Sequence, residues 1–172
     1  MPIECTKLTP KCIWQNGVVP KCCSEHMKEL AIYTCKLFNE LGIQYWLDQR
    51  LLVSALNGTF EPSLSKNVIS YFKKDFSKIA NLNLRVLEDG YYLTTNEVRK
   101  STWIQIFYSN INSNAIDLID CGVMKNVARY NPVFPTLPKT ISLDNILPLQ
   151  KVDFFGTEVN IPAKPNELLK GV

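Results

Sequence analysis

Apolar residues at helical spacing predict one long helix near the start of the chain. They recur every three or four positions from Met27 to Leu41, the pattern of a helix with one buried face. Ser24 is a favourable N-cap and Gly42 follows the last apolar residue, so we expect the helix to begin after Ser24 and to end at Leu41. His26, the only histidine, lies beside the apolar stripe in the first turn and is expected on the surface.

Shorter runs after this helix predict strands alternating with turns and short helices. We expect strands over 43–47 and 68–72, with a short helix over 51–56 between them that Asn57 and Gly58 close. The next part of the chain predicts a helix over 73–82 and a hairpin of strands 84–87 and 91–95 that turns at Asp89-Gly90. An antiparallel pair of strands follows over 103–109 and 115–119, with Asp120 in the loop after it. The C-terminal part predicts an extended proline-rich connection over 131–148, a hairpin over 151–161 that turns near Phe155-Gly156, and a terminal helix over 162–170. Together these elements predict an α+β fold, with one mixed β-sheet packed against helices.

Composition and charge narrow the class of protein. The chain has 172 residues, of which 46% are hydrophobic and 20% charged, as expected for a globular domain that buries a core. Its longest apolar runs are too short for a membrane span, and its first residues lack the pattern of a signal peptide. The net charge of +3 comes from scattered residues, so we expect no nucleic-acid partner.

Cysteines divide the chain into an N-terminal arm, residues 1–23, and a domain over residues 24–172. Four of the six cysteines crowd the arm, and they are the candidates for disulfides in an oxidising lumen: Cys5, Cys12, Cys22 and Cys23. A zinc site formed by Cys5, Cys12, Cys23 and His26 is the competing interpretation, although these residues lack the short spacing of zinc ligands. Cys35 and Cys121 are expected in the core.

The segment Tyr45–Ser70, YWLDQRLLVSALNGTFEPSLSKNVIS, resembles the active-site segment of the LicD and fukutin family of phosphotransferases. The family pattern is W-L-D-x-G-[ST]-L-L-G-A-x-R-x-G followed by I-P-W-D-x-D-x-D-I, and the residues in register with it are Trp46, Leu47, Asp48, Leu52, Ala55, Gly58 and Pro62. Segments 103–109, 115–119 and 147–170 also resemble family segments, in family order. The resemblance covers roughly residues 22–170 and implies a nucleotidyltransferase fold.

The departures from the family pattern bear on its chemistry. Arg50-Leu51 replaces the small turn that would cradle a phosphate, and the three acidic positions are Leu64, Lys66 and Val68. Outside this triplet, the family carboxylate on the later strand 115–119, the third in the family, remains as Asp117. Mg²⁺ prefers oxygen ligands, usually carboxylates and phosphates, so we expect no bound metal.

The sequence therefore predicts a LicD/fukutin-like domain that is not catalytic and that binds a glycan or a protein through the old groove. The alternative is an active phosphotransferase that moves phosphocholine or a phospho-sugar from a nucleotide donor onto a glycan, with Mg²⁺ or Mn²⁺. In that case the candidate substrate contacts are Lys66, whose ammonium could replace the metal charge, and Asp48. The resemblance also implies the Golgi or another lumen of the secretory pathway.

One modification site is suggested by the sequence itself. Asn57-Gly58-Thr59 is an N-glycosylation sequon, and glycosylation there would indicate that the neighbouring groove is no longer used. The same residues are typical of a helix C-terminal cap with Gly58 in the left-handed conformation, which we favour.

Overall fold

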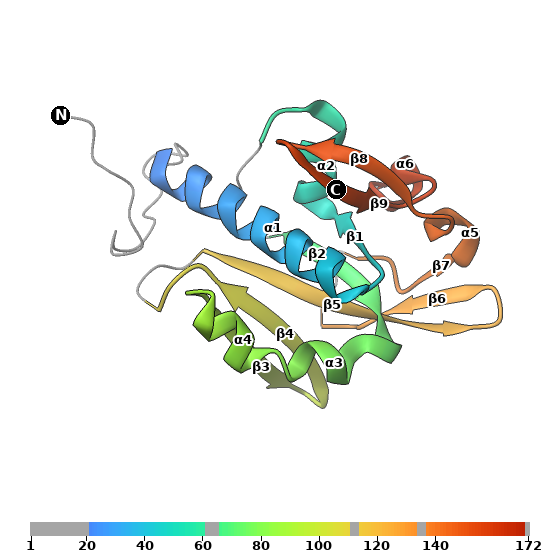
Figure 1. Ribbon diagram of the computed structural model, residues 1–172. Helices are drawn as coiled ribbons and strands as arrows, with labels where there is room; N and C mark the ends of the chain where they lie inside the picture. Colours follow the sequence, from blue (N-terminus) through green and yellow to red (C-terminus); the bar gives the residue numbers. More distant parts are fainter. Residues whose placement is uncertain (1–20, 61–65, 111–113, 134–136, 171–172) are drawn as a thin grey trace.

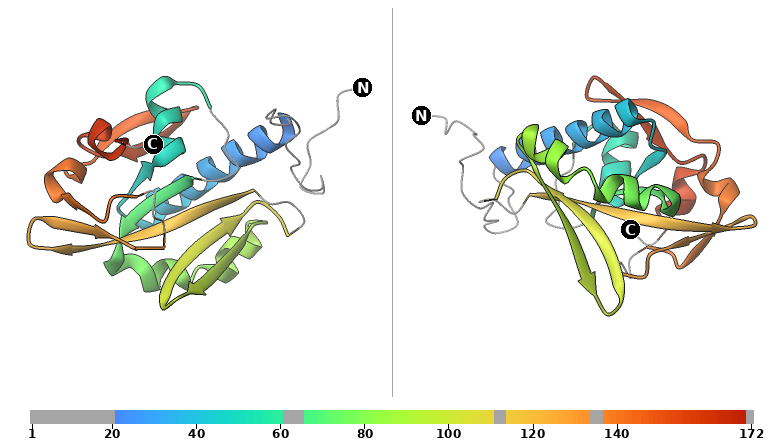
Figure 2. Two further views of the ribbon diagram at one scale, coloured as in Figure 1. Left: turned by 180° about the vertical axis from the view of Figure 1, so that it is seen from behind. Right: turned by 60° about the horizontal axis from the view of Figure 1, so that its bottom comes forward.

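A mixed β-sheet with a long helix on one face forms the centre of the protein (Figure 1). The computed structural model describes residues 21–60, 66–110, 114–133 and 137–170. Helix α1 (Lys21–Leu41) runs along the sheet, and the C-terminal elements lie beside its first strand. Figure 2 shows the same arrangement from behind and from a tilted direction. The predicted α+β class with a mixed sheet is confirmed.

The sheet has the strand order β1-β2-β5-β4-β3, with β6 and β7 continuing from β5. Its strands are β1 (Tyr45–Asp48), β2 (Asn67–Phe72), β3 (Tyr92–Val98), β4 (Ser101–Phe107), β5 (Ala115–Met124), β6 (Val127–Tyr130) and β7 (Thr140–Ser142). Strands β2 and β5 are parallel, and the other neighbours are antiparallel. All six residues of β2 are buried, as is usual for parallel strands covered on both faces.

Strand β5 changes its partner along its length. Residues 115–118 pair with β4, whereas residues 121–124 pair with β6, and both partners lie on the same edge of β5 because β2 occupies the other edge. The sheet therefore divides next to residues 119–120, and this division positions the cavity described below.

The short helices and the second sheet complete the domain. Helix α2 (Gln49–Asn57) follows β1 directly and ends at Gly58, whose φ of 70° and N–H bond to the Ser54 carbonyl form the predicted left-handed cap. Strands β8 (Gln150–Phe154) and β9 (Thr157–Ile161) form the predicted hairpin. The remaining helices are η1 (Lys73–Asp75), α3 (Phe76–Ala80), α4 (Asn83–Glu88), α5 (Leu143–Ile146) and α6 (Pro165–Leu168).

The prediction of a hairpin that turns at Asp89-Gly90 is wrong. Residues 84–87 belong to helix α4, and Gly90 adopts a φ of 90° after its end while its N–H bonds the Leu87 carbonyl. An Asp-Gly pair favours both a hairpin turn and a helix end, and here the helix is formed. Strand β3 pairs with β4 instead, through a turn at Arg99 and Lys100.

Other boundaries differ in smaller ways. Helix α1 begins at Lys21 rather than after Ser24, so the predicted division after residue 23 falls within it. The predicted helix over 73–82 is divided into η1 and α3, and the connection over 131–148 contains β7 and α5. Strand β5 continues to Met124, five residues beyond the predicted end.

Two predictions about single side chains have opposite outcomes. Cys35 and Cys121 are buried free thiols, and burial raises the pKa of each to about 12, so both stay neutral in the core. His26 is only 2% exposed and its ring stacks on Tyr108 with centroids 4.1 Å apart. The expected surface position of His26 is wrong because α1 lies against the sheet from its first turns.

Candidate functional site

A row of residues crosses the sheet where the family resemblance places its carboxylates. Asp48 of β1 pairs in register with Val68 of β2, Val68 with Asp117 of β5, and Asp117 with Gln105 of β4. Residues paired across adjacent strands face the same side of a sheet, so these four side chains share one face. We call this set the Asp117 row.

Asp48 is one of the two fully buried members of the Asp117 row, with Val68. Its carboxylate is fully buried and accepts hydrogen bonds from the Gln49 N–H at 2.9 Å, the Ser70 hydroxyl at 2.9 Å and the Tyr130 hydroxyl at 2.8 Å. Burial raises the pKa of Asp48, and these hydrogen bonds oppose the shift. The two carboxylate oxygens thus connect α2, β2 and β6 through hydrogen bonds. A substrate contact at Asp48 stays a prediction, and the burial of the carboxylate disfavours it.

Asp117 is held by amides rather than by a cation. Its carboxylate accepts a hydrogen bond from Gln105 at 2.8 Å, and the Gln105 side-chain oxygen accepts one from Asn96 at 3.0 Å. Burial raises the pKa of Asp117, while the Gln105 hydrogen bond lowers it. The result is a carboxylate that is fixed in place and partly shielded from solvent.

Val68 and Lys66 stand at two positions where the family resemblance places carboxylates. Val68 is fully buried at the position directly beside Asp117. Lys66 precedes β2 with a φ of 66°, so the alternation of the strand does not extend to its side chain. In the described part of the chain, no hydrogen bond or ion pair joins Lys66 to Asp117, and Leu64 lies outside that part.

The turn after β1 uses its amides within the protein. The Arg50 N–H donates to the Lys66 carbonyl at 3.1 Å, and Leu51 is buried in the core. Gln49 adopts a φ of 47° and is also buried. The Arg50 amide is therefore already engaged where the family pattern has a phosphate cradle, which supports its predicted loss.

The described residues do not fit the metal that the family resemblance implies. A Mg²⁺ ion requires oxygen ligands in an octahedral arrangement, and Asp117 has an apolar side chain on one side and an amide on the other. Within residues 21–60, 66–110, 114–133 and 137–170, no three His, Cys, Asp or Glu side chains gather in a way that could hold a metal ion.

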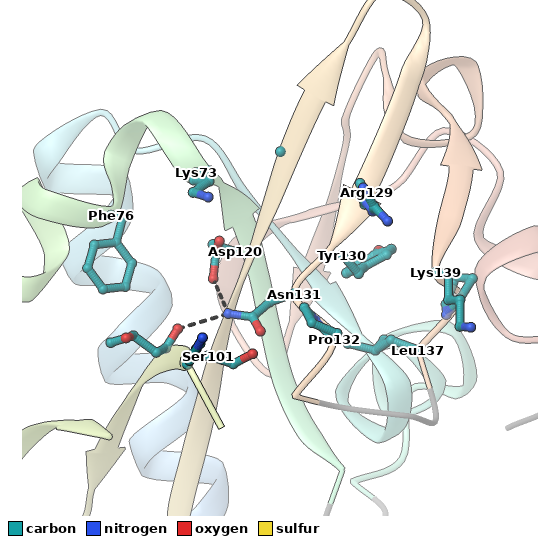
Figure 3. Close-up of a pocket in the computed structure, with 14 residues that line it drawn as sticks. Lys73, Phe76, Ser101, Asp120, Arg129, Tyr130, Asn131, Pro132, Leu137 and Lys139 are labelled. Atoms are coloured by element: carbon teal, nitrogen blue, oxygen red, sulfur yellow. Dashed lines mark hydrogen bonds between the residues drawn. The ribbon is translucent and has the colours of Figure 1, made fainter. Parts of the chain in front are cut away.

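A cavity of about 860 Å³ opens at a different place, where β5 changes partner from β4 to β6 (Figure 3). Asn131 spans this division, because its side-chain amide donates to the Asp120 carboxylate and to the Thr102 carbonyl, both at 2.8 Å. The lining residues are Lys73, Phe76, Lys100, Ser101, Thr102, Asp120, Gly122, Arg129, Tyr130, Asn131, Pro132, Leu137, Pro138 and Lys139. We call this space the β5 cavity.

The lining of the β5 cavity is strongly basic. Among the described residues, four cations contribute to it, and Asp120 is the one acidic residue. In the view of Figure 3, Lys73 lies on one side of β5 and Arg129 and Lys139 lie on the other, with Asp120 between them. All four cations are exposed, whereas Asp120 is 6% exposed. The predicted position of Asp120 in a loop is wrong, because β5 continues past it.

Sequence reasoning missed the β5 cavity because its lining comes from separate segments of the chain. Its cations lie after β2, in the β3–β4 turn, in β6 and before β7, and no two of them are adjacent in sequence. One signal was available: apolar residues continue at every second position beyond Ile119, at Cys121 and Val123, and would have extended β5. That extension would have placed Asp120 and Gly122 on one face of the sheet.

Comparison with solved structures supports the fold. The chain is similar to the aminoglycoside nucleotidyltransferase ANT(2'')-Ia in complex with adenylyl-2''-tobramycin, with a TM-score of 0.50 and 9% identity over 81% of this chain and 69% of that chain. It is also similar to the solution structure of the antibiotic-resistance factor ANT(2'')-Ia, with a TM-score of 0.47 and 10% identity over 80% and 64%. No family model matches the sequence, and the search of curated proteins found no match. The similarity to the ANT(2'')-Ia complex shows that the protein has a nucleotidyltransferase fold.

Several predictions fall outside what these residues test. Cys5 and Cys12 lie outside the described residues, as do the side chains of Cys22 and Cys23, so the disulfides and the zinc alternative stay predictions. Asn57 is exposed at the end of α2, and its glycosylation stays a prediction. No helix in the described ranges is both long and apolar enough to span a bilayer.

Proposed function

We propose that this chain is a LicD/fukutin-like domain of the nucleotidyltransferase fold that does not transfer phosphoryl groups and acts by binding a glycan or a protein. The observation that carries the proposal is the pairing of Val68 with Asp117. A buried apolar side chain occupies the sheet position next to the one family carboxylate that remains. Catalysis would require at least one more oxygen ligand there.

The energetic consequence is large enough to decide between binding and catalysis. Metal ions stabilise the charge of a transferring phosphoryl group by several kcal/mol, and each 1.4 kcal/mol corresponds to about a tenfold change in rate. Without a metal, the rate would fall by about a thousandfold or more. The fold survives such a loss because its core does not depend on the metal ligands.

Lys66 does not supply the missing charge in this arrangement. Its left-handed backbone directs the chain into β2, and its carbonyl holds the start of α2 through the Arg50 N–H. No contact in the described residues brings its ammonium to Asp117. Metal-dependent turnover of a nucleotide donor would instead identify the chain as an active phosphotransferase.

Donor turnover by the purified chain tests the proposal. CDP-choline, a donor that the resemblance suggests, would be incubated with the chain and with Mg²⁺ or Mn²⁺, next to the matched variant Asp117→Asn. We expect both chains to give the same background rate. Turnover that depends on the divalent ion and disappears in Asp117→Asn would overturn the proposal.

Partner binding is measured separately. The immobilised chain would be exposed to a panel of neutral and acidic glycans and to lysate proteins after chemical crosslinking. We expect saturable retention of one glycan class or of one protein. A chain that retains neither would contradict the binding part of the proposal.

A further inference from the structure

We propose that the β5 cavity binds a small molecule that carries phosphate groups. This inference concerns a place other than the Asp117 row, and it holds whether or not that row is catalytic. It is based on the division of the sheet, the charge of the lining, the conformation of one turn and the space beside Gly122.

The division of the sheet creates the room. Strands β4 and β6 follow one another along the same edge of β5, and Asn131 is the residue that ties them together. A crevice forms where neighbouring strands separate, as at the switch points where ligands bind in other open sheets. A volume of about 860 Å³ is within the range of small-molecule sites.

The charge of the lining selects an anion. Lys73, Lys100, Arg129 and Lys139 line the cavity, and the one carboxylate among its described lining residues, that of Asp120, already accepts a hydrogen bond from Asn131. None of the four cations has an ion pair among the described residues. Lysine provides point charges and arginine a planar fork, and phosphate is the group that both bind well.

Lys100 is held at the cavity by an unfavourable backbone conformation. The β3–β4 turn consists of Arg99 and Lys100, with φ values of 47° and 67°. A two-residue turn with both φ values positive favours Asn-Gly, and long side chains adopt this conformation at an energetic cost. Strain of this kind is typical of functional positions, and here it places a cation on the cavity lining.

The rest of the lining suits an organic body attached to the phosphate. Phe76, Leu137 and two prolines provide apolar surface, and Ser101 and Thr102 add hydroxyl groups. Gly122 pairs with Arg129 across β5 and β6, and a Cβ atom there would lie at ordinary contact distance, 3.9 Å from the Lys73 Cδ and 4.0 Å from the Arg129 carbonyl oxygen, so there is room beside it. A sugar or nucleoside phosphate would use both kinds of surface.

Titration calorimetry with inorganic pyrophosphate at low ionic strength tests the proposal on the full chain. We expect saturable binding at one site, weakened at least about tenfold in the double variant Lys73→Gln/Arg129→Gln and weakened by added salt. The control Lys36→Gln/Lys151→Gln removes the same charge from exposed positions outside the cavity and is expected to bind as the unmodified chain does. No saturable binding, or an equal loss in both double variants, would overturn the proposal.

A second pair of variants separates charge from shape. Gly122→Glu and Gly122→Gln add side chains of nearly equal size beside Lys73 and Arg129, and only the first adds a negative charge. We expect Gly122→Glu to bind pyrophosphate at least about tenfold more weakly than Gly122→Gln, with circular dichroism showing both folded. Equal affinities in the two folded variants would contradict an anion site.

Two further probes identify the organic body. Glucose 1-phosphate and cytidine diphosphate present the same phosphate chemistry on a sugar and on a nucleoside. Competition of either with pyrophosphate supports the proposal, and the tighter one indicates the source of the ligand. Binding of a single-stranded oligonucleotide that strengthens with its length, without competition by pyrophosphate, would replace the small-molecule site with a nucleic-acid surface.

Discussion

The Asp117 row and the β5 cavity belong to the same sheet, yet their charged side chains differ in whether they have partners within the protein. In the row, the carboxylate of Asp48 is buried and that of Asp117 is half-buried, and both accept hydrogen bonds from within the protein. In the cavity, Lys73 and Arg129 are exposed and have no ion pair among the described residues. Charged groups that are satisfied internally contribute to folding, whereas charged groups left open are available to a ligand.

The largest effect on this contrast is expected from Asp48→Ala. The substitution leaves the Gln49 N–H and the hydroxyls of Ser70 and Tyr130 buried without their acceptor, which should cost about 3 to 5 kcal/mol of stability. Urea unfolding followed by circular dichroism measures the loss. Asp48→Asn, which keeps one acceptor oxygen, serves as the control and should lose much less. A loss below about 1 kcal/mol in Asp48→Ala would mean that these bonds do not hold the sheet together.

A somewhat smaller effect is expected when a family carboxylate is rebuilt at Val68. Val68→Asp places a charge in the core next to Asp117, and we expect a destabilisation of about 3 kcal/mol at neutral pH. Val68→Asn has the same shape without the charge and should be destabilised less at neutral pH. The difference between the two variants should shrink in acid, where the new carboxyl group is protonated. If the two variants had equal stability at neutral pH, the position would be open to water.

The pH dependence of stability sharpens the account of Asp117. Burial raises the folded pKa of Asp117 above the unfolded value of about 3.9, so the folded chain binds more protons than the unfolded chain. The contribution of Asp117 is therefore complete below the unfolded pKa and is lost as the pH rises through the folded pKa. Asp117→Asn keeps the oxygen that accepts from Gln105 and removes the titration. We expect urea midpoints measured from acid to neutral pH to fall less steeply in Asp117→Asn than in the unmodified chain, and parallel curves would contradict the shift.

The division of the sheet at the β5 cavity is tested by Asn131→Ala. The side chain joins β5 to the start of β4 through Asp120 and Thr102, so its loss should cost about 1 to 2 kcal/mol and loosen the division of the sheet. Hydrogen exchange should then be faster at the start of β4 and at the end of β6. An unchanged exchange pattern would show that the strands hold this geometry without Asn131.

Local patterns in the sequence predicted much of the fold but not the pairing of distant segments. The α2 cap at Gly58, the β8–β9 hairpin and the strand β2 follow from spacing and turn residues that lie close together in the chain. The partners of Asp48 lie 22 and 82 residues away, at Ser70 and Tyr130. No periodicity connects such positions, so the burial of the Asp48 carboxylate required the structure.

The sequence did not predict the β5 cavity for the same reason, and two local predictions near it were also wrong. The predicted strand ended at Ile119, which placed Asp120 in a loop. The hairpin predicted at Asp89-Gly90 paired β3 with residues 84–87, which are helical. With β3 paired to β4, the two-residue turn instead falls at Arg99 and Lys100 and brings a cation to the cavity. Strand pairing decides the location of this site, and pairing depends on contacts that are distant in sequence.

The smallest effect on stability is expected from Arg129→Gln, and it is the sharpest test of the contrast. The Arg129 side chain is exposed in β6, so its removal should change stability by less than about 0.5 kcal/mol. A slight gain would be consistent with relief of repulsion among the cations of the cavity. Urea unfolding without and with pyrophosphate measures both properties in one experiment. The free proteins should unfold together, whereas pyrophosphate should stabilise the unmodified chain more than the variant, because a ligand that binds only the folded state raises its stability. If Arg129→Gln instead lost stability without ligand, its charge would serve folding, and the distinction between the two regions would fail at this residue.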